Sequence, residues 1–325
     1  MPENGNIEKL AKIVSQDIFS WLKWDQRPVM DVDWACELEH HGKKTHPSDT
    51  VFSYIHPYTG DRIYLNTDLK SYQKKSINAT SVRKALQSLA LSVECANVSA
   101  DWQDKFHIDD EYTHTVVGLL FIYNHDNEFD RVFYDLLNAV DRKNLAIANG
   151  NALYVLGPAK IRFLLSVVND MRRLKADDTL PNKSDFTFYY PDLVLSKRHC
   201  GEWGQPATIE MLTGPWIIIK HKAVESTEEG FLIYYSKQGE TIEEFVYFLD
   251  TLSHYQLLLS NYPIRLRFVD ACDDATLNFI KAKEQYLKTW GPDHGREQQL
   301  DRINPESVST IVTKFNPLEV GMRDA

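Results

Sequence analysis

Two short runs of β-branched and aromatic residues, separated by a turn-rich gap, constrain the fold of this chain more than any other feature. The first run covers residues 46–54 and the second covers residues 62–71. Residues 56–61 between them are dense in turn formers, so the two runs predict neighbouring antiparallel strands. Asp49 lies near the start of the first run and Asp68 near the end of the second. A hairpin therefore brings both carboxylates to the same edge of a sheet.

Lys70 is expected to lie beside the two carboxylates. It follows Asp68 by two residues, and side chains two apart on a strand point to the same face. Mg²⁺ and Mn²⁺ prefer oxygen ligands, which Asp49, Asp68 and the Leu69 carbonyl supply. A lysine beside such an ion can orient a water molecule or stabilise charge on a phosphate. The pattern predicts phosphodiester hydrolysis.

The residues that carry this chemistry also resemble a known motif. Pro47-Ser48-Asp49 followed by Asp68-Leu69-Lys70 resembles the PD-(D/E)XK motif of restriction-endonuclease-like nucleases. Ser48 is a departure, because it is inserted between the proline and the aspartate. The resemblance implies that the two acids bind Mg²⁺ or Mn²⁺, that the lysine is catalytic and that the substrate is nucleic acid, with DNA favoured.

The predicted order of elements matches the same family. Residues 7–24 have the apolar spacing of an amphipathic helix, and a strand over 29–39 precedes the two strands described above. A helix then begins near Thr80 or Ser81, and residues 115–124 form a buried strand. This αβββαβ succession is the core of restriction-endonuclease-like folds, so we expect an α/β fold with a mixed sheet. Further acids for the site are Glu8, Asp17, Glu37 and Glu39.

The distribution of charge supports a polyanionic substrate. The chain has a net charge of −10, but residues 41–90 hold eight basic residues against three acidic ones, a net +5. The rest of the chain therefore carries −15, which predicts weak binding to free DNA or delivery by a partner protein. Double-strand cleavage by one site per chain would favour a homo-oligomer. The alternative is an ordinary solvated surface. The candidate substrate-binding residues are Lys43, Lys44, Ser71, Lys74, Lys75, Arg83 and Lys84.

A polar stretch around residues 175–185 is the best boundary between two domains. We expect a nuclease-like domain over 1–175 and a C-terminal α/β domain over 186–325 with an accessory or partner-binding role. In the second half, strands are predicted over 186–195, 216–221, 231–235 and 264–269, and helices over 242–259 and 275–287.

The cysteines and histidines match no recognised zinc pattern. The four cysteines are scattered without a paired spacing, which predicts reduced, structural thiols. His40 and His41 lie near His46, but adjacent histidines on a strand would face opposite ways, so we favour no metal there. His46 is a further candidate to contact substrate. No apolar run approaches a membrane span and no signal segment is visible, so we expect a cytoplasmic protein.

These observations favour a metal-dependent endonuclease. A role in bacterial defence, restriction or repair is implied by the family resemblance only. Two alternatives stay open. One is a non-catalytic subunit that keeps the nuclease fold to bind nucleic acid or a protein. The other is a phosphate-ester hydrolase that acts on small nucleotides.

Overall fold

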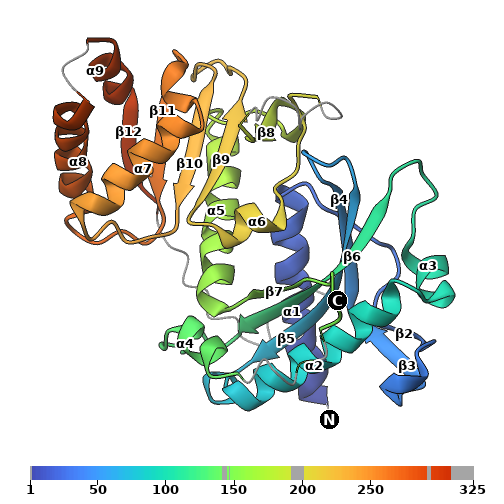
Figure 1. Ribbon diagram of the computed structural model, residues 1–325. Helices are drawn as coiled ribbons and strands as arrows, with labels where there is room; N and C mark the ends of the chain where they lie inside the picture. The colour runs from blue at the N-terminus through green and yellow to red at the C-terminus, as the bar shows by residue number, and fades with distance from the viewer. Residues whose placement is uncertain (1, 141–144, 146, 192–200, 291–293, 309–325) are drawn as a thin grey trace. The chain divides into compact units, whose positions relative to one another are not determined.

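The computed structural model describes residues 2–140, 145, 147–191, 201–290 and 294–308 (Figure 1). The chain divides into two compact units. The first holds residues 2–56 and 60–162, and the second holds residues 57–59 and the described residues after Arg162. The division falls within helix α5 (Pro158–Ala176).

The first unit is built on a five-stranded mixed sheet with the order β1-β4-β5-β6-β7. β4 pairs antiparallel with both β1 and β5, whereas β5, β6 and β7 are parallel. This confirms the predicted hairpin, because Thr50 of β4 lies opposite Thr67 of β5. The strands are β1 (Asp25–Gln26), β4 (Thr50–Ile55), β5 (Arg62–Tyr72), β6 (His114–Asn124) and β7 (Leu153–Leu156).

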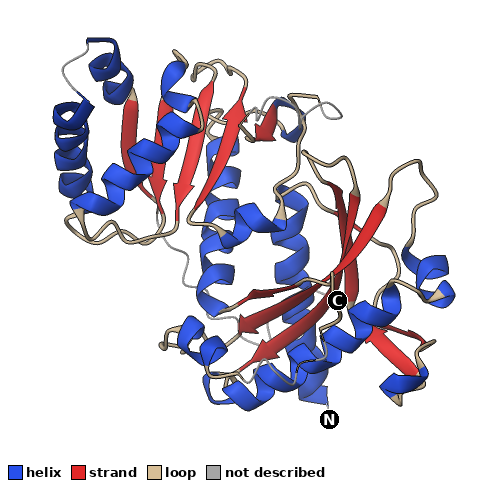
Figure 2. Cartoon of the chain, in the orientation of Figure 1, coloured by secondary structure: helices blue, strands red, loops and turns tan. Residues whose placement is uncertain are grey.

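Helices cover both faces of this sheet (Figure 2). On one face, Phe19 of α1 packs edge-on against Phe121 of β6. On the other, the apolar stripe of α2 packs against Leu120 and Ile122 of β6. A strand covered on both faces is apolar along its length, which explains the unbroken apolar run of β6. The helices of the unit, besides the start of α5, are α1 (Pro2–Trp21), α2 (Ala79–Ala96), α3 (Ala100–Phe106) and α4 (Phe133–Asn138).

One predicted strand has a different place in the structure. The expected strand over 29–39 is only β2 (Val32–Ala35), and it pairs with β3 (Thr45–Ser48) in a separate two-stranded sheet. The edge position beside β4 belongs to the short strand β1 instead. Asp31 has a φ of +52°, a left-handed conformation that interrupts an extended run just before β2. The α/β fold with a mixed sheet is nevertheless the one that the sequence predicts.

The second unit is also built on a five-stranded mixed sheet, with the order β12-β11-β10-β9-β8. β8, β9 and β10 are antiparallel, and β10, β11 and β12 are parallel. The strands are β8 (Phe186–Phe188), β9 (Trp216–His221), β10 (Gly230–Tyr235), β11 (Ile264–Phe268) and β12 (Ile303–Ser307).

Helices α7 and α8 connect the parallel strands of the second unit and bury their apolar faces against the sheet. Phe245 of α7 and Phe279 of α8 pack edge-on in this core. Helix α9 and strand β12 have no counterpart in the sequence prediction. β12 contains Pro305, which cannot donate to a ladder and is tolerated because β12 is an edge strand. The remaining helices are α6 (Ile209–Thr213), α7 (Ile242–His254), α8 (Ala275–Trp290) and α9 (His294–Asp301).

Among the residues that the structure describes, no helix combines the length and the apolar character that crossing a membrane requires.

Candidate active site

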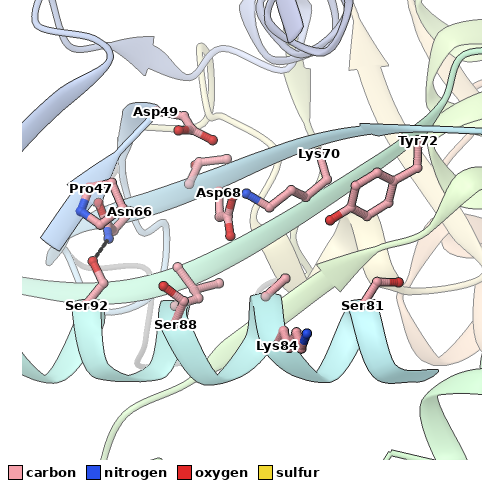
Figure 3. Close-up of a pocket in the computed structure, with 13 residues that line it drawn as sticks. Pro47, Asp49, Asn66, Asp68, Lys70, Tyr72, Ser81, Lys84, Ser88 and Ser92 are labelled. Carbon is pink, nitrogen blue, oxygen red and sulfur yellow. Dashed lines mark hydrogen bonds and ion pairs between the residues drawn. The ribbon is translucent and has the colours of Figure 1, made fainter. Parts of the chain in front are cut away.

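A pocket of about 330 Å³ opens between β5 and α2 of the first unit (Figure 3). It contains all three residues that the sequence predicts for catalysis, Asp49, Asp68 and Lys70. The full lining is Pro47, Asp49, Asn66, Thr67, Asp68, Lys70, Tyr72, Ser81, Lys84, Ala85, Ser88, Leu89 and Ser92.

Strand β5 supplies one wall of the pocket through the alternation of its side chains. Asn66, Asp68, Lys70 and Tyr72 are spaced two residues apart, so they share one face of the strand. Asp68 lies opposite Leu120 of the neighbouring strand, whose side chain packs against α2. The face that carries the acidic and basic groups is therefore the face that α2 covers.

Asp49 lies between β3 and β4, where the chain passes from the small sheet to the large one. Its Oδ2 accepts a hydrogen bond from the Leu69 amide at 2.7 Å. Burial, together with repulsion from Asp68, raises the pKa of Asp49 to about 6. The site thus holds two carboxylates whose negative charges repel each other.

Lys70 partly neutralises this pair. Its ammonium forms an ion pair with Asp68, and the side chain is about one-third exposed. Burial opposes the charge on Lys70, but the attraction of Asp68 and Asp49 outweighs it, so the pKa of Lys70 is raised. Lys70 is consequently protonated at neutral pH, so it can supply a positive charge and hydrogen-bond donors.

Helix α2 supplies the opposite wall. Ser81, Lys84, Ser88 and Ser92 follow one another at spacings of three and four residues, so they form a polar stripe along one side of the helix. Asn78 caps the helix by accepting from the Ser81 amide at 3.0 Å, while the Ser81 hydroxyl accepts from the Asn78 amide. This wall presents hydroxyls and one ammonium to whatever enters the pocket.

A buried hydrogen-bond chain links the walls. The Trp34 indole N–H donates to Ser48 Oγ at 2.9 Å, and Ser48 donates to Asn66 Oδ1 at 2.5 Å. Asn66 then donates from Nδ2 to Ser92 Oγ at 2.8 Å. Ser48, the residue inserted into the motif, therefore connects the loop that carries Asp49 to both β5 and α2.

The basic residues predicted to bind substrate are dispersed. Of the seven candidates, only Lys84 lines the pocket. Ser71 lies on the opposite face of β5 from Lys70, and its hydroxyl lies 3.2 Å from His125 Nδ1. Lys74, in the 3₁₀ turn η2 (Lys74–Ser76), forms an ion pair with Asp130 at 2.6 Å. Lys43, Lys44 and Lys75 are exposed, and Arg83 is half-buried.

Of the further acids considered from the sequence, Asp17, Glu37 and Glu39 do not line the pocket. Glu37 instead accepts a hydrogen bond from the Ala100 amide at 2.7 Å, at the start of α3. Asp17 is half-buried and Glu39 begins the 3₁₀ turn η1 (Glu39–His41). The side chain of Glu8 lies outside the described residues.

The donor atoms of the pocket fit a hard divalent cation. Asp49 and Asp68 supply carboxylate oxygens, which Mg²⁺ and Mn²⁺ prefer. The Leu69 amide points toward Asp49, and in an extended strand the carbonyl of a residue points to the same side as its amide. The Leu69 carbonyl therefore faces Asp49 as well, beyond the last β4–β5 pair. A cation here would relieve the repulsion that raises the pKa of Asp49.

The comparison with protein families decides the assignment. Residues 1–160 match the family model described as the GAPS4 protein PD-(D/E)XK nuclease domain. This part of the chain is a PD-(D/E)XK nuclease domain. The matched segment includes Asp49, Asp68 and Lys70. Searches of curated proteins and of solved structures found no significant match. PD-(D/E)XK nucleases typically use divalent metal ions, which agrees with the oxygen donors of this pocket.

Sequence reasoning missed several residues of the PD-(D/E)XK pocket. Asn66 and Tyr72 flank the predicted Asp68 and Lys70, and extending the two-residue period would have found both. The hydroxyls of α2 carry no comparable signal, because serines on a helix face are usually solvated. Ser88 and Ser92 are recognisable only once α2 is placed over β5.

Proposed function

We propose that this protein is a metal-dependent endonuclease that hydrolyses phosphodiester bonds in DNA. The observation that carries the proposal is the convergence of Asp49, Asp68 and Lys70 in one pocket of a PD-(D/E)XK nuclease domain. We propose a role in bacterial defence, restriction or repair from the family resemblance alone, and we retain a cytoplasmic location as a separate expectation.

Asp49, Asp68 and the Leu69 carbonyl would hold Mg²⁺ or Mn²⁺. When bound, such an ion supplies Lewis acidity and lowers the pKa of a coordinated water. The protein's own contribution is to fix the ligands. The Leu69 amide orients the Asp49 carboxylate, and the chain from Trp34 through Ser48 and Asn66 holds the adjoining loop.

Lys70 is suited to stabilise negative charge on the phosphate. Its ammonium forms an ion pair with Asp68, which holds it on the pocket face of β5. A preorganised cation beside a phosphate is most effective where water is partly excluded, as at this half-buried position. Lys70 can also orient the attacking water by donating a hydrogen bond to it.

The opposite wall is suited to bind the phosphate backbone. Lys84 supplies a positive charge, and Ser81 and Ser88 supply hydroxyls along the same face of α2. Lys74 and Lys75 lie in η2, just before this helix, and add two basic side chains outside the pocket. We expect the double variant Lys74→Ala with Lys75→Ala to weaken DNA binding in a salt-dependent way while Mn²⁺ binding is unchanged. An unchanged affinity and salt slope would remove these two lysines from the binding surface.

The residues after the nuclease domain are proposed to serve an accessory or partner-binding role. Outside residues 41–90 the chain carries −15 charges, which opposes unassisted binding to free DNA. A partner protein would then deliver the nuclease to its target, and a second copy of this chain would supply the second active site that double-strand cleavage requires.

The test is digestion of supercoiled plasmid, single-stranded DNA and RNA with Mg²⁺, Mn²⁺ or EDTA. We expect metal-dependent cleavage of DNA by the wild type and a loss of about 100-fold or more in Asp68→Ala and Lys70→Ala. Lys105→Ala is the matched control, because Lys105 pairs with Asp101 on α3 and does not line the pocket.

The outcomes separate the possible functions. Cleavage of RNA in preference to DNA would correct the substrate. Cleavage that survives both pocket variants would place the active site elsewhere. Binding of DNA without cleavage by the wild type, even with candidate partners added, would favour the non-catalytic alternative.

A further inference from the structure

Four potential metal ligands converge beside the nuclease pocket, in a cluster that the proposed function does not use. They are Cys36, which follows β2, His41 at the end of η1, His46 on β3 and Cys95 on α2. One ligand atom of each lies within 4.8 Å of the ligand atoms of the other three. None of these four residues lines the pocket.

Four of the six separations between these atoms lie within about 0.4 Å of the edges of a tetrahedral zinc site. With Zn–S near 2.3 Å and Zn–N near 2.0–2.1 Å, the edges are about 3.8 Å for S–S, about 3.5 Å for S–N and about 3.3 Å for N–N. Cys36 Sγ lies 3.8 Å from Cys95 Sγ and 3.5 Å from His41 Nδ1. His46 Nε2 lies 3.1 Å from both His41 Nδ1 and Cys36 Sγ.

Hydrogen bonding alone does not account for this arrangement. An imidazole nitrogen carries either one proton or one lone pair, so it makes one good hydrogen bond. His41 Nδ1 and His46 Nε2 each contact two other members of the cluster. A single ion at the common centre satisfies all of these atoms at once.

The groups around the cluster are those that usually support zinc ligands. The far nitrogen of His41, Nε2, lies 3.2 Å from the Glu94 carboxylate. A carboxylate on the second ring nitrogen fixes the tautomer and orientation of a ligating histidine. The Glu37 amide donates to Cys95 Sγ at 3.3 Å, which suits a thiolate. Gly42, with a φ of +59°, lets the chain turn between His41 and His46.

We propose that Cys36, His41, His46 and Cys95 form a structural Zn²⁺ site. Two sulfur and two nitrogen donors in a tetrahedron favour zinc over the hard cations suited to Asp49 and Asp68. All four positions are taken by protein side chains, and His46, Cys95 and the His41 side chain are buried. Closed coordination of this kind is typical of structural sites and leaves no position for a reacting water.

A zinc ion at this site would cross-link the two-stranded sheet of β2 and β3 to helix α2. Three ligands come from the segment that contains β2, η1 and β3, and the fourth comes from α2, which forms a wall of the nuclease pocket. His46 is followed directly by Pro47, which lines the pocket. Zinc would therefore fix the approach of the loop that carries Asp49 without taking part in the chemistry.

The first test is the metal content of the full chain purified under reducing conditions from zinc-supplemented medium. We expect about one zinc ion per chain by mass spectrometry, retained after removal of Mg²⁺ and Mn²⁺ and retained in Asp49→Ala. Replacement by Co²⁺ should give the visible absorption of tetrahedral cobalt with thiolate ligands. Cys95→Ser should lose both signals. Cys272→Ser should keep them, because Cys272 lies outside this cluster, in the second unit.

A second variant tests the site if Cys95→Ser fails to fold. Glu94→Gln keeps all four ligands and removes only the carboxylate partner of His41, so zinc affinity should fall about 10- to 100-fold in competition with a chromophoric chelator. His40→Gln should leave the affinity unchanged, because His40 contacts Glu94 but is not one of the four ligands of the proposed site. A zinc affinity that falls in His40→Gln would instead favour the neighbouring group of His40, His41 and Glu94. Three other results would overturn the proposal: wild-type protein that neither contains nor takes up zinc or cobalt, a Cys36–Cys95 disulfide in its place, or iron at these ligands.

Discussion

Replacing Asp49 by asparagine should stabilise the metal-free protein. Burial and the neighbouring Asp68 carboxylate raise the pKa of Asp49 from 3.8 to about 6, so the folded protein binds the Asp49 proton more tightly than the unfolded chain does. The corresponding contribution to stability is present below pH 3.8 and is lost as the pH rises through about 6. The neutral amide in Asp49→Asn avoids this loss, and its oxygen can still accept from the Leu69 amide.

The size of the effect follows from the shift. Two pKa units correspond to about 3 kcal/mol, and partial solvent contact at Asp49 reduces this to about 2–3 kcal/mol at pH 8. At pH 5 the wild-type carboxyl is mostly protonated in the folded state, so the gain of Asp49→Asn should fall to about half. Urea unfolding at both pH values, in buffer free of divalent cations, measures the difference.

Two further measurements make this test specific. Addition of Mn²⁺ should reverse the ranking, because it stabilises the wild type and not the variant that lacks a ligand. Asp126→Asn should have the opposite sign at pH 8, since hydrogen bonds from the Lys74 and Glu128 amides overcome burial and lower the pKa of Asp126. An Asp49→Asn variant no more stable than the wild type at pH 8 would refute the claim that burial and repulsion from Asp68 destabilise the ionised Asp49 carboxylate.

Three other perturbations have defined outcomes. Lys84→Ala should weaken DNA binding in EDTA and reduce the salt slope by about 0.9, whereas an unchanged slope would show that Lys84 makes no phosphate contact. Asp170→Ala should cost about 3–5 kcal/mol in urea unfolding of the second unit, because the buried Arg267 guanidinium, 2.6 Å from Asp170, would keep only the half-exposed Glu306 carboxylate as an ion-pair partner. Burial lowers the pKa of His221 to about 4, so the unfolded state binds more protons below pH 6.5 and the second unit should lose up to about 3 kcal/mol between pH 6.5 and 4. The same pH dependence in His221→Gln would assign that loss to other groups.

The parts of the nuclease site that depend on local pattern are predictable from the sequence. Alternation along β5 places Asp68 and Lys70 on one face, and the turn-rich gap sets the pairing that brings Asp49 beside them. The same alternation extends to Tyr72. These relations hold within one hairpin, so they need no knowledge of the rest of the fold.

The remaining features depend on contacts that are distant in sequence. The sequence prediction does not bring the four proposed zinc ligands together. It considers His40 and His41 on a strand, whereas they lie in the turn η1, and Cys95 comes from α2. It also places β2 in the main sheet, because the local sequence of β2 predicts a strand but not its pairing partner. In the structure β2 pairs with β3 in a separate sheet. Local propensity does not encode such choices, which tertiary packing makes.

The most direct test of the proposed nuclease metal site, with Asp49 and Asp68 as ligands, is calorimetric titration with Mn²⁺ of the protein purified from zinc-supplemented medium. Metal binding requires neither a substrate nor an activating partner. We expect that the wild type binds Mn²⁺, that Asp49→Ala and Asp68→Ala each lose this binding, and that Lys105→Ala retains it. Equal Mn²⁺ binding by the wild type and both aspartate variants would contradict the assignment of this site, and so would a wild type that binds no Mn²⁺.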